Sequence, residues 1–148
     1  IALARRANGS VGILFIDLDR FKEINDTLGH AVGDELLIAA AARMRQALRA
    51  SDLLARQGGD EFMILLHDIH SMEEARGVAE KIRLATNQPF MLEGSERLIS
   101  VSIGIALYPE HGEDIETLTR NADAAMYRTK TTGRNGASAA PDTASPLD

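Results

Sequence analysis

The 148-residue chain contains no cysteine and no tryptophan. Without cysteine it can form no disulfide, supply no thiol nucleophile and hold no Cys-ligated zinc ion. Aromatic residues make up only 4% of the chain, so the core must consist mainly of aliphatic side chains and methionine. Its apolar runs are much shorter than the roughly 18 residues that a membrane-spanning helix needs, and no signal peptide is visible. These absences favour a soluble, cytoplasmic domain, and any membrane anchor of the parent protein would lie outside these residues.

Basic residues are also few. The chain has 16 Lys and Arg against 22 Asp and Glu, which gives a formal net charge of −6. Binding to nucleic acid depends on basic groups that release counterions, so we expect no nucleic-acid partner. The apolar share of 45% and the charged share of 26% are those of an ordinary globular domain. The length fits one domain with a single core.

Apolar periodicity divides the chain into alternating strands and helices. Strands are predicted at Val11–Ile16, Leu53–Arg56, Phe62–Leu66 and Ile99–Ala106. Helices are predicted at 20–28, from Gly33 to about Ala50, behind a capping box that begins at Ser71, and from Asp114 to near Gly133. The Gly58-Gly59 pair predicts an antiparallel hairpin. The expected fold is therefore α/β (α+β), with a mixed central β-sheet flanked by helices.

The strand predicted at Ile99–Ala106 has two unlike faces. One face carries large aliphatic side chains, and the other carries the small residues Ser102, Gly104 and Ala106. A helix or a ligand could approach the small face closely. At the two ends of the chain, Ile1–Arg6 resembles the end of a helix, and residues 137–148 have the composition of a disordered tail or linker remnant.

Four acidic residues stand where strands end or turn. Asp17 and Asp19 follow the first apolar run, and Asp60 and Glu61 follow the glycine pair of the hairpin. Carboxylates at such places hold Mg²⁺, which prefers oxygen ligands and keeps part of its coordination for phosphate. Any one of these acids alone would be an ordinary turn residue in contact with water. Together they favour a metal site.

These acids belong to a longer series of motifs that extends over residues 1–136 in order and in spacing. The motifs are Phe15-Ile16-Asp17-Leu18-Asp19-Arg20-Phe21-Lys22, Ile24-Asn25-Asp26, Gly29-His30, Gly33-Asp34, Ala55-Arg56-Gln57-Gly58-Gly59-Asp60-Glu61-Phe62, Ser102-Ile103-Gly104-Ile105-Ala106, Tyr108-Pro109, and Asn121-Ala122-Asp123-Ala124-Ala125-Met126-Tyr127 with Lys130 and Gly133-Arg134-Asn135. The series resembles the GGDEF domain of diguanylate cyclases. Several separated motifs in register are far more specific than one short motif.

The resemblance implies a fold like that of nucleotide cyclases and the polymerase palm. It also implies an enzyme that condenses two GTP into cyclic di-GMP and two pyrophosphates, by two-metal phosphoryl transfer. Two Mg²⁺ ions per active site are expected, with Mn²⁺ as an alternative. Asp17 and Asp60 resemble the metal carboxylates, with the Leu18 carbonyl as a further ligand, and Glu61 would help activate the 3′-hydroxyl. Because the product is two-fold symmetric, a homodimer with facing sites is expected.

The same resemblance assigns the substrate contacts. Asn25 and Asp34 look like the guanine-binding residues, since a carboxylate can accept both N1–H and N2–H₂ of guanine. Lys22, Lys130 and Arg134 look like phosphate ligands, together with backbone N–H groups near Phe21 and Lys22.

Arg49 and Asp52 have the spacing of the family's RxxD inhibitory site, which binds the product cyclic di-GMP. The position that supports this site appears in our sequence as Lys81, which lacks the planar fork of arginine and should bind guanine more weakly. A purely structural alternative exists, in which Arg49 complements the end of a helix and Asp52 caps a turn.

The chain also departs from the family pattern. The D-x-L-T-G-L-x-N-R segment that normally precedes the first strand is absent, so the expected domain at 1–136 is truncated at its N-terminus. Two other functions remain open. One is a catalytically silent GTP-binding GGDEF module that regulates a fused phosphodiesterase, and the other is a cyclic di-GMP effector that binds only through Arg49 and Asp52.

Overall fold

The computed structural model describes residues 11–141. Its elements, in chain order, are β1 (Val11–Leu18), α2 (Phe21–Leu28), α3 (His30–Gln46), β2 (Leu53–Gly58), β3 (Glu61–His67), α4 (Met72–Thr86), β4 (Phe90–Leu92), β5 (Ser95–Arg97), β6 (Val101–Leu107), α5 (Ile115–Thr131) and β7 (Gly136–Ala139). The helix end predicted at Ile1–Arg6 lies outside the described residues. Within 11–141, no helix is both long enough and apolar enough to cross a membrane.

Five strands form the central sheet, in the order β2-β3-β1-β6-β7. Strand β1 is antiparallel to both of its neighbours, whereas β6 and β7 are parallel. The predicted mixed sheet is thus confirmed. A separate two-stranded sheet, β4-β5, was not predicted. Its strands have three residues each and are joined by Glu93-Gly94, both with positive φ, which is the geometry of a tight hairpin turn.

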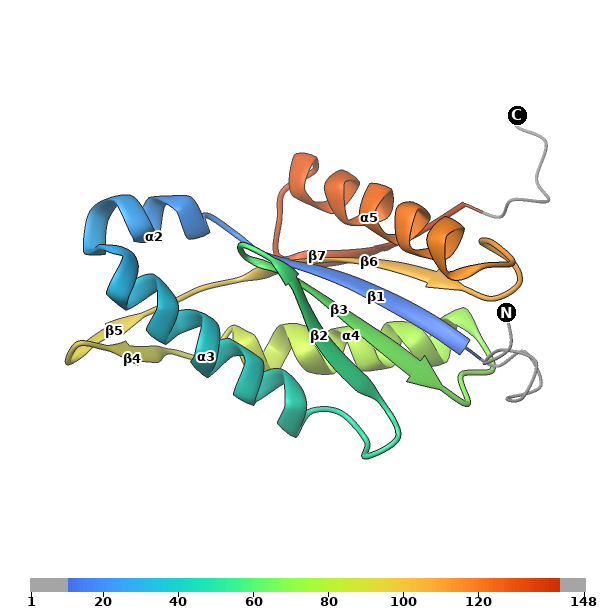
Figure 1. Ribbon diagram of the computed structural model, residues 1–148, viewed down its shortest axis with the longest axis horizontal. Coiled ribbons are helices and arrows are strands. Elements are labelled where there is room, and N and C mark those ends of the chain that lie inside the picture. The colour runs from blue at the N-terminus through green and yellow to red at the C-terminus, as the bar shows by residue number, and fades with distance from the viewer. Residues whose placement is uncertain (1–10, 142–148) are drawn as a thin grey trace.

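Helices cover both faces of the central sheet (Figure 1). Leu14 and Ile16 of β1 belong to the larger core cluster, which includes side chains from α3 and α4, whereas Ile13 and Phe15 pack in the cluster beneath α5. Every residue of β1 is therefore buried. This two-sided burial explains why β1 is a continuous apolar run and not an alternating pattern.

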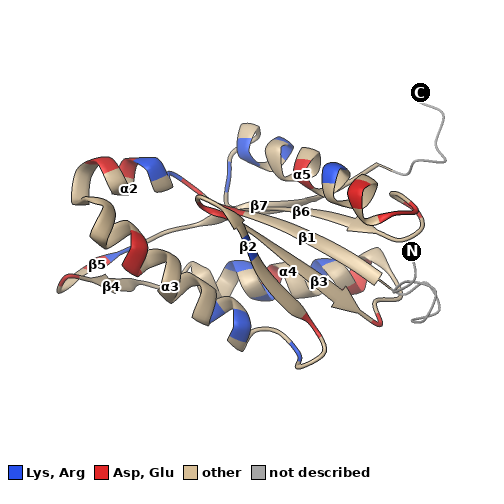
Figure 2. Ribbon diagram, in the orientation of Figure 1, with Lys and Arg blue, Asp and Glu red and all other residues tan. Residues whose placement is uncertain are grey.

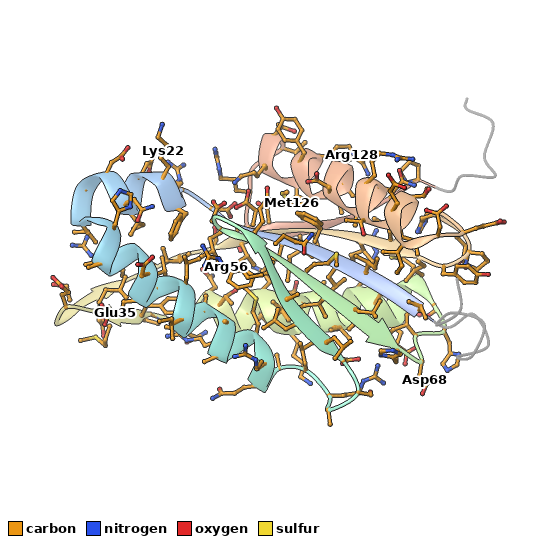
Figure 3. The ribbon with its side chains drawn as sticks, viewed as in Figure 1. Lys22, Glu35, Arg56, Asp68, Met126 and Arg128 are labelled. Atoms are coloured by element: carbon orange, nitrogen blue, oxygen red, sulfur yellow. The ribbon has the colours of Figure 1, made fainter. Side chains whose placement is uncertain are left out.

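The small face of β6 serves a helix. A Cβ atom added to Gly104 would lie 1.9 Å from the carbonyl oxygen of Ala122 in α5. Met126, labelled in Figure 3, packs in the same cluster. The close approach that the sequence predicted is thus between β6 and α5.

Side chains cap two of the helices as the sequence predicted. The Ser71 hydroxyl accepts a hydrogen bond from the Glu74 N–H at 3.0 Å, and Asp114 Oδ1 accepts one from the Thr117 N–H at 2.7 Å. The bond from Thr117 lowers the pKa of Asp114. The capping box differs in one detail, because the Glu74 carboxylate accepts from the N–H of His70 and not from that of Ser71.

Two predicted boundaries were wrong. Helix α3 begins at His30 and ends at Gln46, whereas the apolar pattern placed it from Gly33 to about Ala50. The predicted disordered tail begins too early, because Gly136–Ala139 forms β7 and pairs with β6. The small residues of this strand carry little β-propensity, and its stability comes from backbone pairing that composition does not reveal.

Candidate active site

The candidate site lies at one edge of the sheet, where β1 ends beside the turn between β2 and β3. In the antiparallel register, Asp17 is opposite Glu61, and the Leu18 N–H donates to the Asp60 carbonyl at 3.2 Å. The C-terminal end of α5 and the start of α2 face the same edge (Figure 1). Acidic residues at the strand ends meet basic residues of α5 and of the turn that follows it (Figure 2). Pairing of β1 with β3 therefore brings together acids that are more than forty positions apart in the chain.

Asp17 is the most perturbed acid of this edge. It is only 7% exposed, and its Oδ2 accepts a hydrogen bond from Lys130 Nζ at 2.8 Å. Among the described residues, its buried Oδ1 has no donor. Burial, together with contact with the Asp60 carboxyl, raises the pKa of Asp17 to about 7 although Lys130 acts in the opposite direction. Two carboxylates can share a hydrogen bond only when one carries a proton, so the pair lacks positive charge.

Glu61 lies next to this pair and is partly buried. Burial raises the pKa of its carboxyl, and the negative charges of Asp123 and Asp60 raise it further, while Lys130 opposes them. The sequence reasoning missed Asp123, which comes from α5. A signal existed, because Asp123 precedes Lys130 by seven residues, or about two helical turns, and so shares a face of α5 with it.

The residues present fit a magnesium site. Within residues 11–141, Asp17 has an unpartnered buried oxygen and contacts a second carboxyl, and the positive charge of Lys130 acts on both Asp17 and Glu61. Oxygen ligands of this kind suit Mg²⁺. Within residues 11–141, no three His, Asp or Glu side chains are grouped to hold an ion by themselves. Two carboxylates with the Leu18 carbonyl would leave coordination positions open for phosphate oxygens.

Asp19, by contrast, is fully used by the fold. It is 3% exposed, and it accepts hydrogen bonds from the Ser100 hydroxyl at 2.5 Å, the Ser102 hydroxyl at 2.7 Å and the Asn135 N–H at 3.1 Å. Of the two acids at the end of the first strand, only Asp17 keeps a buried oxygen without a donor among the described residues. The reason is that β1 continues to Leu18, so the two side chains have different surroundings.

The proposed guanine residues lie on two consecutive helices. Asn25 is on α2 and Asp34 is on α3, and Gly29, with φ of 95°, lies between the helices. A Cβ atom added to Gly33 would lie 1.9 Å from Asn25 Oδ1. Glycine at position 33 thus lets Asn25 lie directly against the residue that precedes Asp34. Asn25 Oδ1 is buried and has no partner among the described residues, whereas Asp34 is exposed.

The proposed phosphate ligands come from α2 and from the end of α5. Lys22 is exposed on α2 and is labelled in Figure 3. Phe21 is buried in the core, so only its backbone N–H is suited to an anion, and no side chain caps α2. Lys130 is held by Asp17, and Arg134 follows α5 with φ of 63° and an exposed side chain.

Comparison with known proteins identifies the family of the chain. The family described as "Diguanylate cyclase, GGDEF domain" matches residues 1–136. The chain belongs to the GGDEF family. The structure of the GGDEF domain of PA1120 (YfiN or TpbB) from Pseudomonas aeruginosa superposes with a TM-score of 0.90 at 46% identity, covering 94% of this chain and 87% of that one. This likeness confirms the predicted palm-like cyclase fold of the GGDEF domain.

Two curated relatives, both from Pseudomonas aeruginosa, show the range of proteins in which such a domain occurs. The diguanylate cyclase TpbB is 50% identical over 125 residues, which are 84% of this chain and 29% of that protein. The bifunctional diguanylate cyclase/cyclic di-GMP phosphodiesterase MucR is 47% identical over 136 residues, 92% of this chain and 20% of that protein. The GGDEF chain thus spans less than a third of the length of either relative.

The RxxD corner of the GGDEF domain lies between α3 and β2. The carboxylate of Asp52, whose side chain is 1% exposed, accepts hydrogen bonds from the Arg49 N–H at 3.1 Å, from the Arg49 guanidinium at 3.3 Å and from the His67 N–H at 3.3 Å. Arg49 also donates to the His67 carbonyl. A cavity of about 370 Å³ adjoins these residues and is also lined by Arg45.

Lys81 is exposed on α4, and within residues 11–141 no hydrogen bond or ion pair joins it to Arg49 or Asp52. The contacts of the corner match the structural alternative that the sequence left open, with Asp52 capping the turn.

Proposed function

We propose that this GGDEF domain is a diguanylate cyclase that condenses two GTP into cyclic di-GMP and two pyrophosphates. One observation carries the proposal. Among the described residues, Asp17 has a buried oxygen without a donor, and its carboxyl contacts both Asp60 and Lys130. An enzyme that transfers a phosphoryl group needs such a place for cations and phosphate oxygens. The name of the relative TpbB supports the same activity.

Asp17, Asp60 and the Leu18 carbonyl would hold Mg²⁺, two ions per site, with Mn²⁺ as an alternative. When bound, these ions would neutralise negative charge on the reacting phosphates and help the 3′-hydroxyl lose its proton. Glu61, which adjoins the metal carboxylates, would take that proton. Its raised pKa brings the carboxyl nearer to neutral pH, where a base is most effective.

Asn25 and Asp34 would select guanine. The carboxylate of Asp34 can accept from N1–H and N2–H₂ together, and adenine offers no such pair of donors. The side-chain amide of Asn25 can pair with the same base. Among the described residues its buried oxygen has no hydrogen bond that would have to break first. Loss of either contact should weaken binding by about 1–3 kcal/mol.

Lys22, Lys130 and Arg134 would bind the phosphates, assisted by backbone N–H groups at Phe21 and Lys22. These cations would compensate the charge that develops on the leaving pyrophosphate. Each domain would bind one GTP, and each bound GTP attacks the other. A C2 homodimer that brings two such sites face to face satisfies both requirements, since the product is itself two-fold symmetric.

Cyclic di-GMP would in turn inhibit the enzyme at the Arg49–Asp52 corner. The Arg49 fork suits the N7 and O6 edge of guanine. The corner imposes a condition, because Arg49 is already paired with Asp52 and His67. Product binding must therefore redirect the guanidinium, while backbone N–H groups of Arg49 and His67 keep Asp52 in place. Lys81 would support the site more weakly than an arginine.

A second candidate is a silent GTP-binding module that regulates a fused phosphodiesterase. The relative named cyclic di-GMP phosphodiesterase NbdA, from Pseudomonas aeruginosa, favours it, because that protein is 41% identical over 86% of this chain and its name gives the phosphodiesterase alone. A third is an effector that only binds cyclic di-GMP. Incubation with GTP and Mg²⁺, followed by chromatography, separates the three. We expect cyclic di-GMP. Bound but unchanged GTP would indicate the second function, and binding of added cyclic di-GMP alone would indicate the third.

A further inference from the structure

We infer that Asp19 is a positioning residue, which fixes the turn at 133–135 and thereby places the Arg134 guanidinium for the terminal phosphates of GTP. The inference rests on the proposed function of the site. Asp19 is buried, and in this proposal its carboxylate does not itself contact the substrate. Its action would pass through Asn135 to Arg134.

Asp19 is the point at which two separate segments are joined to the end of β1. The hydroxyls of Ser100 and Ser102 donate to it at 2.5 Å and 2.7 Å, and the backbone N–H of Asn135 donates to its Oδ2 at 3.1 Å. Its own N–H donates to the Ser100 carbonyl at 2.9 Å. The contact with Asn135 spans 116 positions of sequence and is the one that reaches the turn after α5.

The turn that carries Arg134 needs such support. Gly133, Arg134 and Asn135 have φ of 132°, 63° and 49°, so two consecutive non-glycine residues adopt the left-handed conformation. This conformation is disfavoured for residues with a Cβ atom and persists only where the surroundings determine it. Three contacts do so here. The Arg134 N–H donates to the Thr129 carbonyl at 2.9 Å, Asp19 holds the Asn135 N–H, and Arg83 of α4 donates to Asn135 Oδ1 at 3.0 Å.

The Arg134 side chain itself is exposed, and within residues 11–141 it makes no hydrogen bond or ion pair. A long cation of this kind binds tightly only if its backbone is already in place, because ordering it on binding costs entropy. A purely structural Asp19 would affect stability and would weaken all ligands alike. A positioning Asp19 affects the triphosphate selectively and only while Arg134 is present.

The test measures binding of 3′-deoxy-GTP, which lacks the attacking hydroxyl, and of 3′-deoxy-GMP, which lacks the terminal phosphates, both with Mg²⁺. We expect Asp19→Ala to weaken 3′-deoxy-GTP binding roughly 10-fold and 3′-deoxy-GMP binding less than about 2-fold. Asp19→Asn should restore most of the loss. Its amide oxygen can take the place of Oδ2, while its NH₂ group donates to Ser102, whose hydroxyl can also accept.

A double-mutant cycle decides the route of action. Arg134→Ala with Asp19→Ala should bind 3′-deoxy-GTP no more weakly than Arg134→Ala alone, because the effect of Asp19 requires that guanidinium. If the two losses multiply, or if Asp19→Ala weakens both ligands equally, the positioning role is refuted and the proposed function stands. If the parent fails to bind 3′-deoxy-GTP at all, the proposed function fails and the inference with it.

A second variant keeps the test independent of the folding of Asp19→Ala. Arg83→Ala removes the hydrogen bond to Asn135 Oδ1 and should weaken 3′-deoxy-GTP binding about 3-fold. In the Arg134→Ala background it should have no effect. Glu80→Ala is the matched control, because it removes the ion-pair partner of Arg83 but leaves the contact with Asn135. Equal effects of Arg83→Ala and Glu80→Ala would contradict the inference.

Discussion

The end of β1 and the Arg49–Asp52 corner each bury an aspartate beside a basic side chain, yet the two carboxylates differ in how many hydrogen-bond donors they have. Asp52 accepts hydrogen bonds from two backbone N–H groups and from the guanidinium of Arg49. Asp17 accepts a hydrogen bond from Lys130 and contacts the Asp60 carboxyl, but its Oδ1 has no donor among the described residues. Burial and Asp60 raise the pKa of Asp17 to about 7.

The difference separates an acid that stabilises the fold from an acid that is available for chemistry. Buried polar groups are normally satisfied, and an exception calls for an explanation. Perturbed acids also gather at functional sites. Asp19 belongs with Asp52, since three donors satisfy it although it is two residues from Asp17. Position in the sequence therefore says less about the role of an acid than the number of donors that reach it.

The largest expected effect is on catalysis. Asp60→Ala should reduce cyclic di-GMP synthesis by a factor on the order of 1,000 or more, because it removes a carboxylate of the proposed metal site. The fold should survive, since the residue lies on the hairpin turn. Initial rates and thermal unfolding check both expectations. Glu96→Ala, which removes an exposed acid from β5, is the control and should leave the rate unchanged. Normal turnover in Asp60→Ala would refute the mechanism.

The opposite result is expected at the corner. Asp52→Ala should lower the free energy of unfolding by about 1–3 kcal/mol, because it leaves the partly buried N–H groups of Arg49 and His67 without this acceptor. The initial rate with GTP should change little at a temperature where the variant is folded. Denaturant unfolding with parallel rate measurements tests this. A stable but inactive variant would contradict the assignment of Asp52 as an acid that stabilises the fold.

Asp17→Asn should stabilise the metal-free protein. Asp17 ionises at about 3.8 in the unfolded chain and at about 7 in the folded one, so folding is penalised as pH rises through this range and most above it. The neutral amide avoids the penalty. We expect the free energy of unfolding of Asp17→Asn to exceed that of the parent by about 1–3 kcal/mol at pH 8. This difference should shrink as the pH approaches 4. Urea unfolding with a chelator at both pH values measures it, and a loss of stability at pH 8 would contradict the account.

The smallest effects concern product inhibition. Arg49→Ala should relieve inhibition by cyclic di-GMP with little change in the initial rate, and Lys81→Arg should tighten it by less than about 1 kcal/mol. An initial-rate series with added product on the parent and both variants provides the data. If the parent is not inhibited at high product, or Arg49→Ala is inhibited equally, then Arg49 and Asp52 serve the fold alone.

The sequence predicted those parts of the molecule that leave a signal in side-chain type. Strand β1 is a continuous apolar run, and the hairpin has its glycine pair, so both were found. Strand β7 was missed because backbone pairing with β6 holds residues of little β-propensity. In the candidate site, the structure brings together four residues that the motifs marked, which are Asp17, Asp60, Glu61 and Lys130. The three donors of Asp19 and the position of Asp123 near Glu61 were not predicted, because they come from segments that are far away in the sequence.

The most direct test of the central claim is metal binding at the end of β1. Mn²⁺, which has an electron paramagnetic resonance signal and oxygen-ligand preferences like those of Mg²⁺, can be titrated into the parent, Asp17→Asn, Asp60→Ala and Asp52→Ala. The account predicts that the parent binds the ion, that Mg²⁺ displaces it, and that Asp17→Asn and Asp60→Ala lose this binding. Asp52→Ala, where folded, should bind as the parent does. Equal binding by the parent and Asp60→Ala, or none by the parent, would contradict the claim that these unsatisfied carboxylates form a metal site.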